Sequence, residues 1–344
     1  MKENFNLFDN KVFIIAELSA NHNGSIETAI ETIKAAKRSG ADAIKFQTYT
    51  ADTITLSVKT KDFLLNNGTI WDGRYLHELY QEAYTPWEWH KELYRVSREE
   101  GLICFSSPFD LTAVDFLESL ENPIYKIASF EITDIPLIKY VASKDKPMII
   151  STGIATKDDI ELAIATCKEE GNNQIVILKC TSSYPAPLEE ANLIMISELA
   201  KKYGVITGLS DHTLGITAPV VAVAQGAKVI EKHFILDKSI GGPDASFSLD
   251  QKEFTKMVTA VREAELALGK IDFSLTEKQI QGRVFSRSLY IAKNVKKGDL
   301  VTLDNLKSVR PGYGMHPKHL SNLIGKHYKK DCIAGTRAEE NLFK

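Results

Sequence analysis

The chain has 344 residues, of which 44% are hydrophobic and 25% are charged, and its net charge at pH 7 is −3. This length suits one large α/β barrel with a small second domain, and the composition excludes a disordered or fibrous chain. The longest apolar stretch, residues 218–224, is far shorter than the ~20 residues that span a bilayer, and residues 1–10 carry three charges, so we expect neither a membrane anchor nor a signal peptide.

Short apolar or β-branched runs alternate with amphipathic stretches over the first 270 residues, as is typical of successive parallel βα units. The eight runs are residues 12–17, 43–48, 103–107, 125–129, 148–152, 175–180, 205–210 and 229–234. The amphipathic stretches include residues 25–39, 87–100, 157–170, 189–202 and 251–268, several of them closed by a glycine. Eight such units predict a TIM (β/α)8 barrel.

Residues 49–86 form a longer excursion between the second and third predicted strands. They contain NNG at 66–68 and WDG at 71–73, which are typical of turns, together with several aromatic residues. We expect a loop that folds over the mouth of the barrel.

The pattern changes after Gly269, and from residue 284 the chain consists of short strand-like runs and turns. We therefore predict a barrel domain over 1–270, a linker over 271–283 and a small β-rich domain over 284–344. Residues 284–344 hold 12 Lys and Arg against 5 Asp and Glu, whereas residues 1–283 hold 30 against 40. Since the basic module lacks a nucleic-acid-binding motif, we expect a solvated face or a cap over an anionic ligand, and no nucleic acid partner.

All eight predicted strands end in polar residues, at the edge where the active site of a TIM barrel lies. Residues two apart in a strand share a face, which predicts several inward-pointing pairs. The pairs are Lys45 and Gln47, Ser210 and His212, and Glu231 and His233. Lys126 differs in parity from Ser129 and Glu131, so a bulge or a strand end must intervene if all three face the site.

Lys45 and Lys126 are predicted at this mouth together with several serines and glycines. Taken singly, each lysine is also explained as a surface charge or as half of a structural ion pair. Together, point charges and hydroxyl or amide donors are the usual chemistry for an anionic phosphate. We therefore expect a phosphorylated ligand.

His212 and His233 end adjacent predicted strands, where their imidazoles could meet at one divalent metal. A pair of hydrogen-bonded core histidines explains the same spacing, and no CxxC or HExxH pattern separates the two alternatives.

The four cysteines, Cys104, Cys167, Cys180 and Cys332, form no CxxC pair, which favours a reduced, cytoplasmic protein. Cys180 is expected to be a buried packing residue, because no base is placed beside it by the sequence.

The motifs, in their order, resemble the sialic acid synthase family, phosphoenolpyruvate-dependent enzymes that condense a three-carbon unit onto an N-acetylated sugar aldehyde. The resemblance runs from AELSANHNG (16–24) through IKFQTYT, FSSPFD, YKIASFEITDIPLI, STGIAT, KCTSSYPAP, GLSDHT, EKHFILDK and GGPDASFSL. It ends with FSRSLYIAKNVKKGD and SVRPGYG, which look like the family's C-terminal antifreeze-like (SAF-type) domain.

Within this family, AELSANHNG, KIASFEITDIPLI and GPDASFSL are more similar to pseudaminic acid synthases than to N-acetylneuraminate synthases. That branch implies 2,4-diacetamido-2,4,6-trideoxy-L-altrose as the acceptor and pseudaminic acid and phosphate as the products. An N-acetylneuraminate or legionaminic acid synthase is the alternative.

The resemblance also implies roles for individual residues, carried over by matching position. The phosphoenolpyruvate ligands would be Lys45, Ser107, Lys126, Ser129, Ser151, Ser182 and Ser210. The sugar would meet Gln47, Tyr184 and Arg310. The catalytic residues would be Glu17, Glu131, His212 and His233, and the two histidines would hold Mn²⁺ or Mg²⁺. Ser182 departs from the family pattern, which has asparagine there, so this contact differs from that of the relatives.

The family further implies a homodimer in which the C-terminal domain of one chain caps the barrel of the other and contributes Arg310. Two rival functions stay open. A Schiff-base aldolase would use Lys126, Lys179 or Lys232 as a covalent nucleophile and need no metal. A non-catalytic sugar- or ice-binding protein would keep the fold without the chemistry.

Overall fold

The structure, a computed structural model, describes residues 11–344. These residues belong to two compact units that divide between Gly269 and Lys270. The expectation of no signal peptide concerns residues 1–10, which lie outside the described residues. Along the described part of the chain, none of the helices combines the length and the apolar character needed to cross a membrane.

The first unit is a closed barrel of eight parallel strands, which confirms the predicted TIM barrel. The strands are β1 (Phe13–Glu17), β2 (Ala43–Thr48), β3 (Ile103–Pro108), β4 (Tyr125–Ile127), β5 (Met148–Ser151), β6 (Ile175–Cys180), β7 (Ile206–Asp211) and β8 (Val229–His233). Each strand pairs with the next in chain order, and β1 pairs with β8 to close the barrel.

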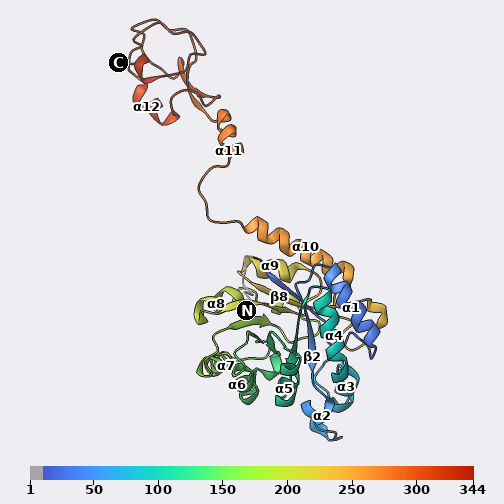
Figure 1. The fold of residues 1–344 in the computed structure, drawn as a ribbon. Coiled ribbons are helices and arrows are strands. Elements are labelled where there is room, and N and C mark those ends of the chain that lie inside the picture. The colour runs from blue at the N-terminus through green and yellow to red at the C-terminus, as the bar shows by residue number, and fades with distance from the viewer. Residues whose placement is uncertain (1–10) are drawn as a thin grey trace. The chain divides into compact units, whose positions relative to one another are not determined.

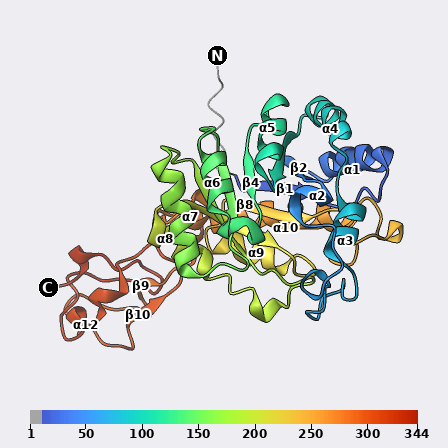
Figure 2. The same ribbon diagram turned by 90° about the horizontal axis from the view of Figure 1, so that it is seen from below.

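Helices surround the strands on the outside of the barrel (Figure 1, Figure 2). The helices of this unit, including α2 and α3 in the excursion over 49–86, are α1 (Ile26–Arg38), α2 (Ala51–Ile54), α3 (Leu76–Ala83), α4 (Trp87–Glu99), α5 (Leu111–Ser119), α6 (Ile135–Ala142), α7 (Lys157–Glu169), α8 (Met195–Tyr203), α9 (Thr217–Ala224) and α10 (Gln251–Leu268).

Local sequence signals set several helix boundaries. Thr156 begins α7 with a capping box, in which its side chain and that of Asp159 accept each other's backbone N–H groups. Gly101 follows α4 with a φ of 68°, a conformation that glycine adopts without strain. The helix predicted over 189–202 begins only at Met195, because Asn192 has a φ of 46° and interrupts the helical path.

The excursion over 49–86 is not only a loop, because it contains α2, α3 and a short 3-10 turn, Lys61–Phe63. Its turn at Trp71 reaches the segments that follow β6 and β8. The Trp71 indole N–H donates to the carbonyl of Pro243 at 3.3 Å, and its ring lies 5.4 Å from that of Tyr184. These contacts bring the excursion to the mouth of the barrel, as expected.

The barrel wall separates two apolar cores. Ile15 and Val229 belong to the cluster inside the barrel, whereas their neighbours Ile14 and Ile230 belong to the larger cluster between the barrel and its helices. This alternation is the strand period of two, with both faces of the parallel sheet buried. Each buried large apolar side chain contributes roughly 1.5–3 kcal/mol to stability.

The second unit is small and has its own core. Strand β9 (Ser288–Ile291) pairs antiparallel with β10 (Leu306–Val309), and isolated bridges and a short helix, α12 (Leu320–Leu323), complete the unit. Leu289, Tyr328 and Phe343 are among its buried residues. Within the segment predicted as a linker, Glu277–Gly282 forms helix α11.

Candidate active site

The inner face of the barrel changes from apolar to polar toward the C-terminal ends of the strands. On β8, Val229 lies in the interior apolar cluster, and Glu231 and His233 follow on the same face. The inward polar residues of the strands are Glu17, Lys45, Gln47, Ser107, Lys126, Ser151, Ser210, Glu231 and His233. The strand register places Glu17 opposite both Lys45 and His233, so the polar ends meet at one mouth.

Four buried charges form a cluster at this mouth. The Lys45 Nζ lies 2.7 Å from Glu17 Oε2 and 3.0 Å from Glu231 Oε1. The Lys126 Nζ lies 3.5 Å from the same Glu231 oxygen, and the Ser210 hydroxyl donates to it at 3.1 Å. Two lysines and two carboxylates are therefore balanced inside the site, which excludes the surface-charge alternative for both lysines.

The charges of this cluster set unusual pKa values. Burial lowers the pKa of Lys45 to about 7, although Glu231 opposes the shift. Burial alone would raise the pKa of Glu231, but Lys126 and Lys45 outweigh it and lower that pKa to about 2. Glu231 is thus a carboxylate at neutral pH, and an incoming anion would favour the protonated form of Lys45.

Several buried polar atoms at the mouth have no hydrogen-bond partner among residues 11–344. They are the Ser107 and Ser151 hydroxyls, Glu131 Oε2, Glu231 Oε2 and His233 Nδ1. Most buried polar groups in folded proteins are paired, so a cluster of unpaired ones indicates a place prepared for a ligand.

Gly153, just after β5, opens a cradle next to these atoms. Its N–H donates to Ser129 Oγ at 3.1 Å. A Cβ at this position would lie 2.0 Å from Ser182 Oγ and 2.7 Å from Ser129 Oγ, so only glycine allows the two hydroxyls and the amide to converge. Such a group of donors fits the oxygens of an anion.

Lys126 differs in parity from Ser129 and Glu131, and a strand end between them explains how all three can lie at the mouth. Strand β4 stops at Ile127, and Ser129–Thr133 forms a 3-10 turn that brings the later residues back to the mouth. Burial raises the pKa of Glu131 to about 7, with Lys126 opposing the shift. Glu131 can therefore hold or release a proton near neutral pH.

The two predicted metal ligands lie beside each other, with the His212 and His233 ring centroids 5.3 Å apart. His212 Nδ1 donates to the carbonyl of Thr181 at 3.0 Å, which leaves Nε2 with a lone pair when the ring is neutral. Burial lowers the pKa of His233 well below its usual value, so this imidazole is neutral. Two adjacent imidazoles, one neutral with an unpaired buried nitrogen, fit a divalent metal, which would bind His212 in its neutral form.

Protein side chains alone do not complete a metal shell at this pair. No cluster of three or more His, Cys, Asp or Glu side chains suited to a metal occurs among the described residues. The remaining ligands would be oxygens of substrate or water.

Cys180 is buried, as expected, but it does have a basic neighbour. Its sulfur lies 3.8 Å from His212 Nδ1 and 3.9 Å from Ser182 Oγ. Burial lowers the pKa of His212, but the contact with Cys180 outweighs burial and raises it overall. This neighbour could not be predicted from the sequence. Cys180 ends β6 and His212 follows β7, and the distance between two strand ends does not follow from their sequences.

An aromatic wall flanks the histidines. The Tyr184 ring lies 4.4 Å from His212 and 5.2 Å from Phe247, and Phe247 lies 4.9 Å from His233. On the polar side, Gln47 donates to Glu17 Oε1 at 3.2 Å and to a neighbouring serine hydroxyl at 2.9 Å. One side of the mouth is thus apolar and the other is rich in hydrogen-bonding groups.

Sequence reasoning missed two acidic residues of this site. Glu231 was placed at the strand end without a role, yet it contacts both lysines. Asp244, within the GGPDASFSL motif, is buried, and its Oδ2 lies 3.8 Å from His233 Nδ1. Glu231 shares the inward face of its strand with His233, so the strand period of two could have identified it. Asp244 lies in a loop, which has no period from which the direction of a side chain follows.

Three other predicted residues lie elsewhere. Arg310 belongs to the second unit, where it is exposed just after β10. Lys179 donates to the carbonyl of Cys180 at 2.7 Å, and Lys232 pairs with Asp211 at 2.5 Å. Because Lys179 and Lys232 have the parity of the outer face, neither can serve as an inward Schiff-base lysine.

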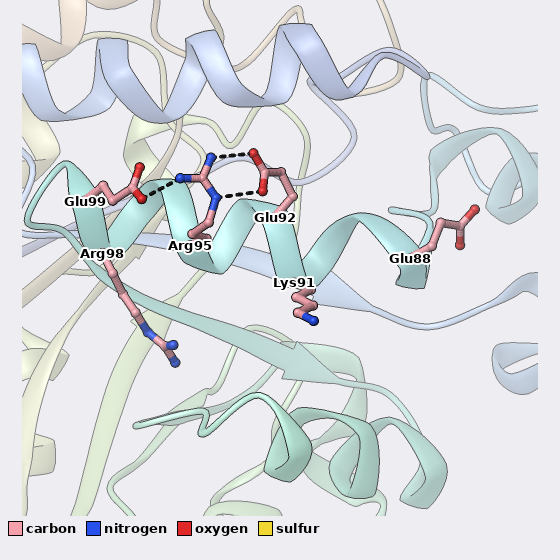
Figure 3. Close-up of a pocket in the computed structure, with 6 residues that line it drawn as sticks. All are labelled: Glu88, Lys91, Glu92, Arg95, Arg98 and Glu99. Atoms are coloured by element: carbon pink, nitrogen blue, oxygen red, sulfur yellow. Dashed lines mark hydrogen bonds and ion pairs between the residues drawn. The ribbon is translucent and has the colours of Figure 1, made fainter.

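A hollow on α4 carries no site (Figure 3). Its six lining residues are charged side chains of this one helix: Glu88, Lys91, Glu92, Arg95, Arg98 and Glu99. Arg95 pairs with Glu92 and Glu99, so the hollow is explained by helix-surface ion pairs.

Comparisons with known proteins identify the family of this chain. The NeuB family model matches residues 32–273, more than half of the chain, and the SAF domain model matches residues 286–336. Pseudaminic acid synthase of Campylobacter jejuni (strain 81-176) is 51% identical, covering 99% of each chain, and that of Helicobacter pylori is 46% identical, covering 94% of this chain and 95% of that one.

More distant relatives include the N,N'-diacetyllegionaminic acid synthase of Legionella pneumophila, 38% identical over 94% of this chain and 92% of that one. Among solved structures, the N-acetylneuraminic acid synthetase of Leptospira borgpetersenii is 32% identical, with a TM-score of 0.71 over 79% of this chain and 90% of that one. The resemblance found in the sequence is confirmed, and the chain belongs to the NeuB family.

Proposed function

We propose that this protein is a pseudaminic acid synthase, a transferase that condenses phosphoenolpyruvate with 2,4-diacetamido-2,4,6-trideoxy-L-altrose to give pseudaminic acid and phosphate. The relatives named pseudaminic acid synthase are 51% and 46% identical, whereas the legionaminic acid synthase is 38% identical. This difference favours the first acceptor over the alternatives.

The observation that carries the proposal is the group of buried, unpaired polar atoms beside the two lysines. Phosphoenolpyruvate brings a carboxylate and a phosphate, which need positive charge and several donors. Lys45 and Lys126 supply the charge. The unpaired hydroxyls of Ser107 and Ser151 would donate directly. The hydroxyls of Ser129, Ser182 and Ser210 would join them, with Ser210 turning from Glu231 to the ligand and the Gly153 N–H keeping its bond to Ser129.

His212 and His233 would hold the divalent metal, Mn²⁺ or Mg²⁺. A metal there supplies Lewis-acid polarisation of the acceptor aldehyde, which the weakly nucleophilic enol carbon requires. The hydrogen bond from His212 Nδ1 to the Thr181 carbonyl orients that ring, and burial keeps His233 uncharged.

The acidic residues would transfer protons and orient hydroxyl groups. Glu131, with a pKa raised to about 7 by burial, can donate or accept a proton at neutral pH. Glu17 accepts from Gln47 and pairs with Lys45, so it orients both a sugar-side and a phosphate-side group. Tyr184 gives the acceptor an apolar wall beside the metal ligands.

We further propose a homodimer in which the C-terminal unit of one chain caps the barrel of the other. Five consecutive βα loops each expose a large apolar residue at the mouth: Leu111, Phe130, Ile154, Leu188 and Leu214. Such a ring favours a protein cover over open solvent. Arg310 is exposed beside Val309 and Tyr313, which are also exposed.

Complementation tests the shared site. Arg310→Ala and His233→Ala are each expected to be inactive, but their mixed dimer would contain one intact site. Random co-assembly would restore about a quarter of wild-type activity. No recovery in mixed dimers verified by mass spectrometry would mean that Arg310 serves its own barrel or none.

The central test is phosphate release from phosphoenolpyruvate with a panel of N-acetylated sugars. We expect turnover with the 2,4-diacetamido-2,4,6-trideoxy-altrose acceptor and less with N-acetylmannosamine. Borohydride trapping distinguishes a Schiff-base aldolase from the synthase. A lysine that is trapped covalently, together with activity that EDTA does not change, would overturn the synthase proposal. Absence of release with every sugar would favour a non-catalytic binding protein.

A further inference from the structure

A fully buried ion pair crosses from β7 to β8 directly behind the two histidines. Asp211 and Lys232 are partners in the strand register, and their side chains are 1% and 0% exposed. The Lys232 Nζ lies 2.5 Å from Asp211 Oδ2. Replacing such a pair by apolar residues is often neutral or stabilising, so stability alone does not explain its presence.

The pair holds the chain on both sides of His212. Lys232 also donates to the carbonyl of Thr213 at 2.5 Å, and Asp211 Oδ1 accepts from the Thr213 N–H at 2.9 Å. The residues before and after His212 are thus tied to one lysine. The His212 carbonyl itself accepts from Ala186 N–H at 3.0 Å.

The same lysine is the residue immediately before His233. Alternation points Lys232 out of the barrel and His233 into it, as it does for Asp211 and His212. One ion pair on the outer face therefore sets the relative position of the two strand ends that carry the imidazoles on the inner face. Metal ligands must lie within about 0.2 Å of the required distances, so this position matters.

We infer that Asp211 and Lys232 are positioning residues that set the spacing of His212 and His233 for a divalent metal. This inference rests on the proposed function, because that function assigns the metal to the two histidines. A purely structural pair would change the stability of the protein and leave the metal affinity of the folded protein unchanged.

The experiment measures Mn²⁺ binding to the full-length protein, without substrates, from the electron paramagnetic resonance signal of free Mn²⁺. Lys232→Met alone leaves a buried carboxylate unpaired and can unfold the chain. The main variant is therefore the double substitution Asp211→Asn with Lys232→Met, which removes both charges. Asp211→Asn alone is a second variant. Its amide oxygen keeps the acceptor for the Thr213 N–H, but it leaves the buried Lys232 without a carboxylate, so its folding must be verified too.

We expect the dissociation constant for Mn²⁺ to rise about ten- to a hundred-fold in the double variant, and by a smaller factor in Asp211→Asn. Lys146→Met is a control for the loss of a lysine ion pair elsewhere in the barrel domain, since Lys146 forms a partly exposed pair with Glu118 at 2.6 Å. The affinity of this variant for Mn²⁺ should stay within about twofold of wild type. Circular dichroism melts establish which variants are folded at the assay temperature.

Two outcomes separate this inference from the proposed function. Wild-type affinity for Mn²⁺ in a folded double variant or in folded Asp211→Asn would overturn the positioning role alone. Wild-type binding that persists in His212→Ala and His233→Ala would overturn the metal assignment of the proposed function itself.

Discussion

The affinity for phosphoenolpyruvate is expected to fall as the pH rises above 7, because Lys45 must be protonated to bind the anionic groups. Burial lowers the pKa of Lys45 to about 7, with Glu231 opposing the shift. A bound anion raises this pKa again. The binding contributed by Lys45 is therefore fully present below the pKa of the free protein and is lost above it.

The size of the effect follows from the protonated fraction. With a pKa of about 7, Lys45 is about half protonated at pH 7 and about 1% protonated at pH 9. The dissociation constant should rise about fifty-fold over this range, or about 2.3 kcal/mol. Burial raises the pKa of Glu131 to about 7 as well. Glu131 therefore gains negative charge over the same pH range, which further lowers the affinity for phosphoenolpyruvate.

Isothermal calorimetry of phosphoenolpyruvate binding between pH 7 and 9, in buffer with EDTA, measures this dependence. Lys45→Met should bind weakly and lose most of the slope, and Glu131→Gln should lose the smaller part. Ser107→Ala is the control, because an uncharged hydroxyl should lower affinity equally at each pH. A wild-type dissociation constant that stays within threefold from pH 7 to 9, or an unchanged slope in Lys45→Met, would refute the reasoning.

Three further predictions concern other parts of the site. His212→Ala or His233→Ala should abolish turnover with little change in melting temperature, since the lost contact matters mainly in the transition state; near-wild-type kcat in chelated buffer would contradict the metal assignment. Lys126→Ala should weaken phosphoenolpyruvate by ~2–4 kcal/mol in KM and in calorimetry, and unchanged constants would remove this lysine from the site. Gly153→Ala places a Cβ 2.0 Å from Ser182 Oγ, so affinity for phosphoenolpyruvate should fall by about tenfold or more in a folded protein; wild-type affinity would show that the cradle does not bind the ligand.

Much of the barrel could be predicted from the sequence, because each strand is a short apolar run and each ends in polar residues. Parity within a strand also predicted that His233 and Lys45 point inward, and both share a face with Val229 and Ala43, whose side chains fill the barrel interior. The same rule, applied to Lys232, excludes it as an inward nucleophile, since it alternates with Glu231 and His233.

The contacts between strands were beyond such reasoning. Lys45 on β2 and Lys126 on β4 both reach Glu231 on β8, although neither strand is adjacent to β8. Parity gives the direction of a side chain but not the distance across a barrel, which depends on strand tilt and side-chain length. Asp244 was missed for a related reason, because its loop has no period from which a direction follows.

The balance of charges explains how such a site persists without its ligand. Glu17 and Glu231 neutralise Lys45 and Lys126 in the free protein, so the buried lysines are not left unpaired. Among the described residues, the unsatisfied atoms at the mouth include neutral hydroxyls, single carboxylate oxygens and one nitrogen of His233, at a smaller cost each. An anion accepts hydrogen bonds from the hydroxyls and also competes with Glu231 for the lysines. A neutral ligand of the same shape can accept from the hydroxyls but cannot compete for the lysines. The arrangement therefore selects for a ligand with negative charge at two points, as phosphoenolpyruvate has.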